Sequence, residues 1–276
     1  MIIVKIKGGL GNQLFCYSFA KALSMKNISV KIDDHSFFNK KILHEGNQLK
    51  YFNISLESAS LNEIYKFTGT NRLLKKIKIY RGKYIIDKNL NFNQRFLELK
   101  GNLYLDGYFQ SEKYFNNYRE LLLKEFIFRY DQSVEFLFKE ILKKNYCSVH
   151  IRRGDFTNKI NLKIHGLLDI SYYRTAINFL KTKGFKNFII FSDDIQWCKN
   201  HLNIYGVNII FSDFGLNSIQ ELNLMSKCNS NIIANSSYSW WGAWLNQNDN
   251  KFVIAPKKWL AINSSIDIVP ENWIKI

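Results

Sequence analysis

Two adjacent arginines, Arg152 and Arg153, come directly after an apolar run that is typical of a β-strand. His150 lies within the run, and Gly154 and Asp155 follow the pair. A guanidinium presents a planar fork of N–H donors that matches the oxygens of a phosphate group. The pair therefore predicts a diphosphate site. The alternative is an internal ion pair with Asp155 or another carboxylate, above all for Arg153.

Two carboxylates, Asp193 and Asp194, follow the next apolar run along the chain. Aspartate is favoured at helix N-caps, and a carboxylate can hold a guanidinium in a fixed orientation. We interpret the pair as an N-cap and a support for Arg153. A metal site is the alternative, which the absence of a third residue at a ligand-like spacing disfavours.

Small hydroxyl residues, Ser236, Ser237 and Ser239, open a predicted helix after a further apolar run. Backbone N–H groups at a helix start bind anions, and the helix dipole strengthens the attraction. This segment is therefore predicted to be a second phosphate contact. Upstream, Glu221 lies on another predicted helix, where an acid is ordinarily solvated but can also accept hydrogen bonds from a guanine edge.

A glycine-rich turn near the start of the chain contains Gly9 and Gly11 and is followed at once by Asn12. Its spacing departs from the dinucleotide fingerprint G-x-G-x-x-G, and the acid expected about twenty residues later is ambiguous between Asp33 and Asp34. The turn nevertheless lets the backbone approach a ligand closely. We expect its amide side chains to face a ligand.

Strands must position these residues. From residue 146 onward, apolar runs of strand length alternate with helical periodicities. The predicted order is strand Cys147–Ile151, helix Ser171–Thr182, strand Phe188–Phe191, helix Asp194–Leu202, strand Val207–Phe211, helix Ile219–Ser226, strand Asn231–Ala234, helix Ser239–Leu245 and strand Phe252–Ala255. Such alternation predicts a parallel, doubly wound sheet, whose ligands bind at the carboxyl ends of the strands.

The first part of the chain is less regular. A strand at Ile2–Ile6 leads through the glycine turn into a helix, and further strands are predicted at Ser29–Asp33 and Leu103–Phe109. Two helices are expected within Glu112–Lys144, whereas residues 34–100 show no definite pattern. The change of rhythm predicts two domains, residues 1–145 and 146–276.

The chain of 276 residues is 46% hydrophobic and 16% aromatic, which excludes an intrinsically disordered protein. Its formal net charge is +16, mostly on lysines in the first 145 residues. This charge suits nucleic acid, an anionic membrane surface or a phosphorylated ligand, or serves solubility alone. Without a C-x-x-C pair, a leader or a membrane span, we expect reduced core thiols in a cytosolic protein.

Four segments, taken together and in this order, resemble the inverting α-1,2-fucosyltransferases of glycosyltransferase family 11 over residues 3–259. They are Gly8 to Phe15, His150 to Phe156, Phe191 to Asp194 with Trp197 and Cys198, and Asn235 to Leu245. The resemblance implies an α/β fold of GT-B type, with two Rossmann-like domains facing a cleft. It also implies GDP-fucose on the second domain, the acceptor sugar on the first, and no required metal or other cofactor.

The resemblance also assigns residues to the donor. It implies that Arg152 contacts the β-phosphate of GDP-fucose, and that Arg153 is positioned by the two aspartates. It leaves open which of the three serines binds the diphosphate. The full donor-binding set is His150, Arg152, Arg153, Asp155, Asp193, Asp194, Glu221, Ser236, Ser237, Ser239, Gly9 and Gly11.

The implied catalytic residues are Arg152, His165 and Asn12. Negative charge develops on the β-phosphate as GDP leaves, so a fixed Arg152 would stabilise the transition state more than the ground state. Inversion requires in-line attack by the acceptor hydroxyl, and His165, Asp33 and Asp34 are candidate general bases. Asn12 resembles an amide that faces the reacting centre in protein O-fucosyltransferases.

We therefore expect a galactoside α-1,2-fucosyltransferase that acts on a terminal galactose of a surface glycan, including a lipid-linked one. An α-1,6- or protein O-fucosyltransferase is the alternative. A basic nucleic-acid-binding protein is disfavoured, because aromatic and basic residues do not interleave in a known motif. The expected location is the cytoplasm, with peripheral attraction of the basic first domain to an anionic inner membrane face.

Overall fold

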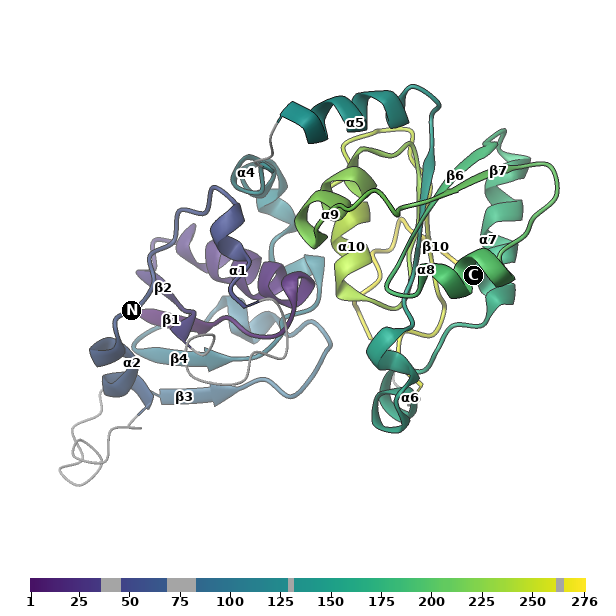
Figure 1. The fold of residues 1–276 in the computed structure, drawn as a ribbon. Helices are drawn as coiled ribbons and strands as arrows, with labels where there is room; N and C mark the ends of the chain where they lie inside the picture. Colours follow the sequence, from purple (N-terminus) through teal and green to yellow (C-terminus); the bar gives the residue numbers. More distant parts are fainter. Residues whose placement is uncertain (36–45, 69–82, 129–131, 262–265) are drawn as a thin grey trace. The chain divides into compact units, whose positions relative to one another are not determined.

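The computed structural model describes residues 1–35, 46–68, 83–128, 132–261 and 266–276 (Figure 1). The chain forms two compact units. Unit 1 comprises Met1–Ile127 and Ile266–Pro270, and unit 2 comprises Phe128–Ser265 and Glu271–Ile276. The predicted α/β class with two Rossmann-like parts is confirmed, because each unit contains a parallel sheet with helices packed on it.

The boundary between the units lies earlier than the predicted one at residue 145. The reason is helix α5 (Gln132–Leu142), which buries Val134, Phe138 and Ile141 and packs with α9 (Ser218–Lys227) of unit 2. A short C-terminal segment also returns to unit 1, where it buries Ile268. The point at which strands and helices begin to alternate in the sequence is therefore the first strand of unit 2, whereas the unit itself begins earlier, before its first helix.

Unit 1 is built on a four-stranded parallel sheet in the order β2-β1-β4-β3 (Figure 1). The strands are β1 (Ile2–Lys5), β2 (Val30–Asp33), β3 (Lys83–Ile86) and β4 (Leu103–Asp106). The α-helices described in this unit are α1 (Leu10–Ser24), α2 (Leu61–Thr68) and α4 (Arg119–Glu125), and the short 3-10 helices are η2 (Leu49–Tyr51), η3 (Gln94–Leu97), η4 (Glu112–Tyr114) and η5 (Asn116–Tyr118).

Helix α1 supplies much of the core of unit 1. Its Phe15 and Phe19 side chains are fully buried, and the Phe19 ring stacks on that of Phe109 with centroids 3.9 Å apart. Burial of aromatic side chains of this size contributes about 1.5–3 kcal/mol each. The helix, and the glycine turn before it, are therefore held firmly against the sheet.

Unit 2 is built on a six-stranded parallel sheet in the order β10-β9-β8-β5-β6-β7. The strands are β5 (Cys147–Ile151), β6 (Asn187–Ser192), β7 (Asn208–Phe211), β8 (Asn231–Ile232), β9 (Val253–Ala255) and β10 (Ile274–Lys275). The remaining helices are η6 (Gly154–Thr157), α6 (Lys159–His165), α7 (Ile170–Thr182), α8 (Ile195–His201) and α10 (Ser237–Trp244). Figure 1 shows α7 and α8 on one side of this sheet, and α9 and α10 on the other.

The strand order places a topological switch point in each unit. In unit 2 the chain runs from β5 to β6 and β7 on one side, and later to β8, β9 and β10 on the other. In unit 1, β2 and β4 lie on opposite sides of β1. Ligands of open parallel sheets bind where the strand order reverses, at the carboxyl ends. The relevant ends are those of β5 and β8, and of β1 and β4.

The strands and helices predicted for unit 2 are confirmed, with small shifts at their ends. The predicted strand Leu103–Phe109 is shorter: β4 ends at Asp106, and Phe109 beyond it adopts a φ of 50° that is incompatible with a strand. The elements β3, β10, α2 and α6 were not predicted. All four cysteines are buried free thiols, as expected. Parts of the stretch at 34–100, for which the sequence shows no definite pattern, lie outside the described residues.

No helix within the described ranges is both long and apolar enough to span a membrane.

Candidate active site

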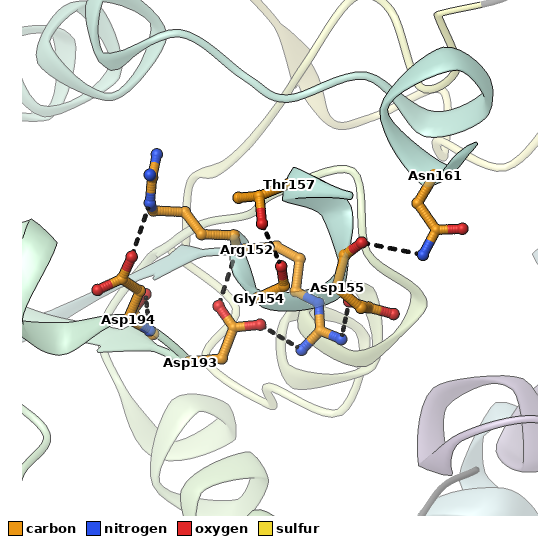
Figure 2. Close-up of polar contacts among 9 residues, drawn as sticks. Arg152, Gly154, Asp155, Thr157, Asn161, Asp193 and Asp194 are labelled. Atoms are coloured by element: carbon orange, nitrogen blue, oxygen red, sulfur yellow. Dashed lines mark hydrogen bonds and ion pairs between the residues drawn. The ribbon is translucent and has the colours of Figure 1, made fainter. Parts of the chain in front are cut away.

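Arg152 follows β5 at the switch point of unit 2 and is held by two carboxylates, as Figure 2 shows. Its Nη1 lies 2.8 Å from Asp193 Oδ2, and its Nη2 lies 2.6 Å from Asp155 Oδ1. The side chain is 30% exposed. Each contact uses one N–H, so three of the five guanidinium N–H donors remain for a ligand.

Arg153 is held more tightly than Arg152. Its Nε lies 3.1 Å from Asp194 Oδ2, and its guanidinium lies 3.8 Å from the centroid of the Trp197 ring. Its backbone N–H donates to Asp193 Oδ1 at 2.8 Å. The geometry matches the prediction that Asp193 and Asp194 position this arginine.

The two aspartates also do the structural work that was inferred for them. Asp194 caps α8 by accepting the Trp197 N–H with Oδ1, and the hydrogen bond from Arg153 lowers the pKa of its carboxyl. All four carboxylate oxygens of Asp193 and Asp194 are engaged. Within the described parts of the chain, no group of three or more His, Cys, Asp or Glu residues is arranged to hold a metal. That the reaction needs no metal stays a prediction.

Gly154 explains why Asp193 can reach the arginines. A Cβ atom at this position would lie 2.3 Å from Asp193 Oδ2, far inside contact distance. Any side chain here would displace the carboxylate that holds Arg152. The glycine after the arginine pair is therefore a packing requirement of the ion-pair network.

The charges of this network differ from the expectation of a cationic site. Three carboxylates, those of Asp155, Asp193 and Asp194, surround two guanidiniums. Both arginines thus make internal ion pairs. Attraction for a diphosphate must therefore come from the remaining oriented N–H donors rather than from net charge. Asp155 has the most exposed side chain of the three acids, at 46%.

The start of α10 lies after β8, on the other side of the switch point. Its N-cap residue, Ser236, makes no side-chain capping bond. Ser239 is buried and its hydroxyl bonds to the carbonyls of Ala234 and Ser236 at 3.3 and 3.2 Å. Ser236 and Ser237 are half-buried, with side chains that make no hydrogen bond in the part of the chain the structure covers. These two hydroxyls, and not that of Ser239, remain for an anion.

His150 lies in β5 on the face covered by α9 and α10. Its ring is buried, with the centroid 5.5 Å from that of Tyr238, whose hydroxyl donates to the Ser218 carbonyl at 2.6 Å. Burial, aided by the charge of Arg152, lowers the pKa of His150 to about 3, so the ring is neutral. These contacts tie β5 to the starts of both helices.

Glu221 lies in the first turn of α9, near the end of β7. Its Oε1 accepts a hydrogen bond from the Ser212 hydroxyl at 2.7 Å. Burial raises its pKa to about 7, although the bond from Ser212 works in the opposite direction. The structure therefore brings this acid to the same sheet edge as the arginines, half-buried rather than solvated.

His165 ends α6 and joins the network through an aromatic residue. Its ring stacks on Phe156 with centroids 4.7 Å apart, and Phe156 lies 5.6 Å from the Arg152 guanidinium. The His165 carbonyl accepts a hydrogen bond from Asn235 Nδ2 at 2.8 Å. Burial lowers the pKa of His165, against the opposing charge of Asp155.

Sequence reasoning gave no role to three residues that build this site. Trp197 supports Arg153, Phe156 separates Arg152 from His165, and Asn235 joins β8 to the end of α6. The only signals in the sequence were the positions of the two aromatic residues: Phe156 lies four residues after Arg152, and Trp197 lies three residues after Asp194. Both aromatics belong to the motifs, but nothing in the sequence identifies their rings as contacts of the arginines.

The other predicted residues belong to unit 1. Gly9 is the N-cap of α1, Gly11 is buried within that helix, and Asn12 Oδ1 accepts a hydrogen bond from Gln110 Nε2 at 2.7 Å. The structure thus places the predicted residues of unit 2 along the carboxyl edge of its sheet, with Glu221 near the end of β7, and these three residues at the switch point of unit 1.

The two candidate bases at the end of β2 are engaged within unit 1. Asp33 is buried and accepts hydrogen bonds from the Tyr104 hydroxyl at 2.5 Å and from the His35 N–H at 2.9 Å. Asp34 accepts a bond from Asn47 Nδ2 at 2.8 Å. Asp33 is therefore a structural acid.

Comparison with known proteins places the chain in a family. Residues 39–276 match the family Glycosyl transferase family 11. The chain belongs to this family. It is therefore a glycosyltransferase, and the resemblance inferred from its four motifs is confirmed.

Two relatives span nearly the whole of this family 11 chain. It is 33% identical to the O-antigen biosynthesis glycosyltransferase WbnK of Escherichia coli, over 98% of this chain and 99% of that protein. It is 35% identical to an Alpha-1,2-colitosyltransferase of Escherichia coli, over 100% and 99% of the two chains. A third relative, the Galactoside 2-alpha-L-fucosyltransferase SEC1 of Bos taurus, is 28% identical over 36% of this chain and 28% of that protein.

Proposed function

We propose that this glycosyltransferase transfers L-fucose from GDP-β-L-fucose to the 2-hydroxyl of a terminal galactose, with inversion. The observation that carries the proposal is the position of Arg152, which keeps free N–H donors at a switch point whose other side is the uncapped start of α10. Two sets of N–H donors on neighbouring strand ends suit a diphosphate. The bovine relative is named as a galactoside 2-alpha-L-fucosyltransferase.

The donor would use three groups in unit 2. Arg152 donates to the β-phosphate, and Ser236 and Ser237 donate hydroxyl and backbone hydrogen bonds to the diphosphate. Glu221 accepts N–H groups of the guanine edge. His150, neutral and buried under Tyr238, forms the wall between these contacts.

The chemistry follows from the leaving group. When the bond from fucose C1 to the β-phosphate oxygen breaks, charge gathers on that oxygen, and Arg152 is already fixed by Asp155 and Asp193 to receive it. Such preorganised donors contribute about 3–4 kcal/mol to transition-state stabilisation. His165, with its pKa lowered, is unprotonated near neutral pH and is the proposed acceptor of the hydroxyl proton.

Transfer of colitose is the second candidate, because a relative similar over its full length is named as an Alpha-1,2-colitosyltransferase. Colitose is fucose without the 3-hydroxyl, so both sugars present the same diphosphate to unit 2. A site that hydrogen-bonds the 3-hydroxyl discriminates strongly against the sugar that lacks it. The ratio of kcat/KM for GDP-fucose and GDP-colitose decides between the two donors.

The test is an assay of the purified chain with each GDP-sugar and lactose, with the product linkage determined by NMR. An α-1,2-fucosyl-lactose product with activity unchanged by EDTA is expected. An α-1,6 linkage, or failure of GDP-fucose to be consumed while GDP-colitose is, would overturn the fucosyl proposal. Full dependence on a divalent ion would assign Asp193 and Asp194 to a metal.

We also propose that the acceptor is a surface glycan intermediate of the O-antigen type, and that unit 1 associates peripherally with anionic membrane. The WbnK relative supports the first part by its name. The second part rests on the excess of basic over acidic residues in the first 145 positions, of which Lys5, Lys7 and Lys21 are paired within unit 1. Vesicle sedimentation that does not rise with anionic lipid content would remove the membrane proposal.

A further inference from the structure

Helix α6 differs from the other α-helices of unit 2 in burying none of its seven side chains. Each of the others, α5, α7, α8, α9 and α10, buries at least one. Three large apolar side chains of α6 face the solvent: Ile160 is 73% exposed, Leu162 43% and Ile164 42%. Single exposed apolar residues are ordinary on a protein surface, whereas a group of them marks an interaction site. The exposed face of α6 is therefore a candidate docking surface.

Three contacts hold α6 in place, and all of them leave this face open. Asn161 Nδ2 donates to the Asp155 carbonyl at 3.0 Å, and the His165 ring stacks on that of Phe156. The backbone carbonyl of His165 accepts the hydrogen bond from Asn235, which follows β8. Figure 1 shows α6 below the sheet of unit 2, apart from the helices on its two faces. The apolar side chains are therefore exposed on a helix that is fixed from its other side.

The side chains of α6 form stripes, because residues four positions apart lie on the same face of a helix. The two side chains that anchor the helix, at positions 161 and 165, form one stripe. Ile160 and Ile164 form the second. Lys159 and Lys163 form the third, with Leu162 on its far side. Both lysines are exposed, and within the part of the chain that the structure describes neither makes an ion pair.

The segment that contains α6 carries no acid: residues 156–168 include neither Asp nor Glu. Two acids flank this segment, and both are engaged. Asp155 pairs with Arg152. Asp169 caps α7 by accepting the Ser171 N–H at 2.8 Å. The exposed face of α6 therefore combines aliphatic surface with positive charge.

The size and charge of this face favour a lipid surface over a protein. A helix of seven residues is about 10 Å long and about 10 Å wide with its side chains. Its exposed face is far smaller than the roughly 800 Å² that each partner buries in a stable protein interface. A membrane needs no such area, because aliphatic side chains in the headgroup region and lysines near anionic lipids act together.

We propose that α6 docks unit 2 on an anionic phospholipid membrane. Ile160 and Ile164 enter the boundary between the headgroups and the acyl chains. Lys159 and Lys163 bind the lipid phosphates. This surface belongs to unit 2 and is distinct from the lysines of unit 1 considered above. It does not depend on the identity of the transferred sugar.

Docking through α6 would bring the arginine site to the membrane surface. Phe156 stacks on His165 and lies 5.6 Å from the Arg152 guanidinium, so one residue separates the helix from that site. An acceptor carried on a lipid is confined to the same surface. The consequence, which rests on the proposed function, is faster use of a lipid-borne acceptor without a change in the use of a free one.

The test is sedimentation of the whole chain with vesicles of phosphatidylcholine alone and with vesicles that also contain phosphatidylglycerol. One double variant is Ile160→Gln with Ile164→Gln, called here the isoleucine variant. The other is Lys159→Gln with Lys163→Gln. Glutamine is a good helix former, and the replaced side chains are exposed, so both variants should fold.

Helix α5 of the same unit supplies the matched controls. Phe136 is 66% exposed there, so Phe136→Gln also replaces an exposed apolar side chain on a helix. Lys139 and Lys143 pair with Glu135 and Glu140, so Lys139→Gln with Lys143→Gln removes the same net charge at a place where charge is balanced. We expect both controls to bind vesicles within about twofold of wild type.

Wild type should bind the vesicles that contain phosphatidylglycerol and lose binding as salt is raised. Each double variant of α6 should bind about tenfold more weakly, because aliphatic insertion and lysine attraction both contribute. Equal binding by wild type and the isoleucine variant, or an equal loss in Phe136→Gln, would overturn the proposal. Circular dichroism monitors folding, and Ile160→Gln alone replaces the isoleucine variant if the latter does not fold.

A second copy of this chain is the competing occupant of the face. Analytical ultracentrifugation without lipid measures self-association. We expect the same mass for wild type and the isoleucine variant at every protein concentration. A mass that rises with concentration in wild type but not in the isoleucine variant would assign the face to self-association and overturn lipid docking.

Activity separates docking from a role in the donor site. With GDP-fucose and free lactose, the isoleucine variant should keep kcat and KM within about twofold of wild type. With lactosylceramide in the anionic vesicles, its rate should fall in proportion to the lost binding. Equal losses on both acceptors would overturn the docking role. If wild type consumes no GDP-fucose, the proposed function has failed, and vesicle binding still tests α6 alone.

Discussion

Both units are built on a parallel sheet with a switch point, but they differ in the side chains that they place there. In unit 2 the ends of β5 and β8 bring Arg152 beside an uncapped helix start. In unit 1 the ends of β1 and β4 bring together amides, a tyrosine and Lys7, which shares the carboxylate of Asp106 with Lys5. The switch point thus offers the oriented N–H donors of a guanidinium in unit 2, and amides beside two lysines in unit 1.

The difference shows why pairing with a carboxylate has unlike consequences for arginine and lysine. After two ion pairs, Arg152 keeps N–H donors in fixed directions, because its guanidinium is planar and has five of them. Lys7 is a point charge that shares the single carboxylate of Asp106 with Lys5, so this pairing fixes no planar set of donors.

The largest effect should come from Arg152→Ala in unit 2. Loss of the N–H donors to the β-phosphate is expected to lower kcat by about 10²–10³-fold with the fold intact. Steady-state kinetics with GDP-fucose measure it. The control is Lys199→Ala, which breaks the surface pair with Asp213 in the same unit and should leave kcat unchanged. Activity near that of wild type in Arg152→Ala would remove the distinction between the two switch points.

A smaller effect is expected from Gly154→Ala. The added Cβ would collide with Asp193 Oδ2 and displace the carboxylate from Arg152. We expect GDP affinity to fall about tenfold, which corresponds to 1.4 kcal/mol. Calorimetry with GDP measures the loss. In an Asp193→Ala background the same substitution should cost little further affinity, and additive losses would mean that the glycine acts elsewhere.

A pH dependence should follow from Glu221. Burial raises its pKa to about 7, and only the carboxylate accepts guanine N–H groups, so GDP affinity should fall severalfold as the pH drops through 7. Glu221→Gln should flatten the profile. The same shift favours the folded state below the ordinary pKa of 4.5, a benefit lost as the pH rises to about 7. A profile that is identical in the variant would exclude Glu221 from the base contact.

The smallest effect concerns Asp106 in unit 1. Burial opposes ionisation of this acid, but hydrogen bonds from Lys7, Tyr84 and Lys5 outweigh it and lower its pKa to about 2. Its stabilising contribution is therefore present above about pH 4 and lost as the pH falls toward 2, on the order of 1 kcal/mol. Acid unfolding of wild type and Asp106→Asn, followed by circular dichroism, measures the difference. Equal slopes would show that the two lysines and Tyr84 do not hold Asp106 in its ionised form.

Much of the fold of unit 2 could be predicted because its elements are short and strongly patterned. The predicted strand Cys147–Ile151 matches β5 at both ends, because a short apolar run between a helix and a polar turn is typical of a buried strand. In contrast, β3 is largely exposed and β10 has two residues, so neither carries a burial pattern. The segment after β4 still alternates in an apolar pattern, so the sequence did not show that pairing ends at Asp106 or that Phe109 adopts a positive φ.

The sequence predicted which residues belong to the site better than it predicted what each of them does there. Motif and strand-end position together pointed to Arg152, Asp193 and Ser236. They did not reveal that the Ser239 hydroxyl is hydrogen-bonded to backbone carbonyls. Nor did they reveal that more carboxylates than guanidiniums lie around the two arginines. Such pairings depend on distances between segments far apart in the sequence.

By itself the sequence determined the alternation of strands and helices, and the residue types that stand at the strand ends. Both are local properties of hydrophobic period and side-chain chemistry. Only the tertiary structure decided which charges remain available, because ion pairing joins Arg152 to Asp193 and Lys7 to Asp106 across long stretches of chain. It also decided that Gln110 contacts Asn12 and that Tyr108 lies beside Lys7, since the order β2-β1-β4-β3 brings the end of β4 beside the first strand.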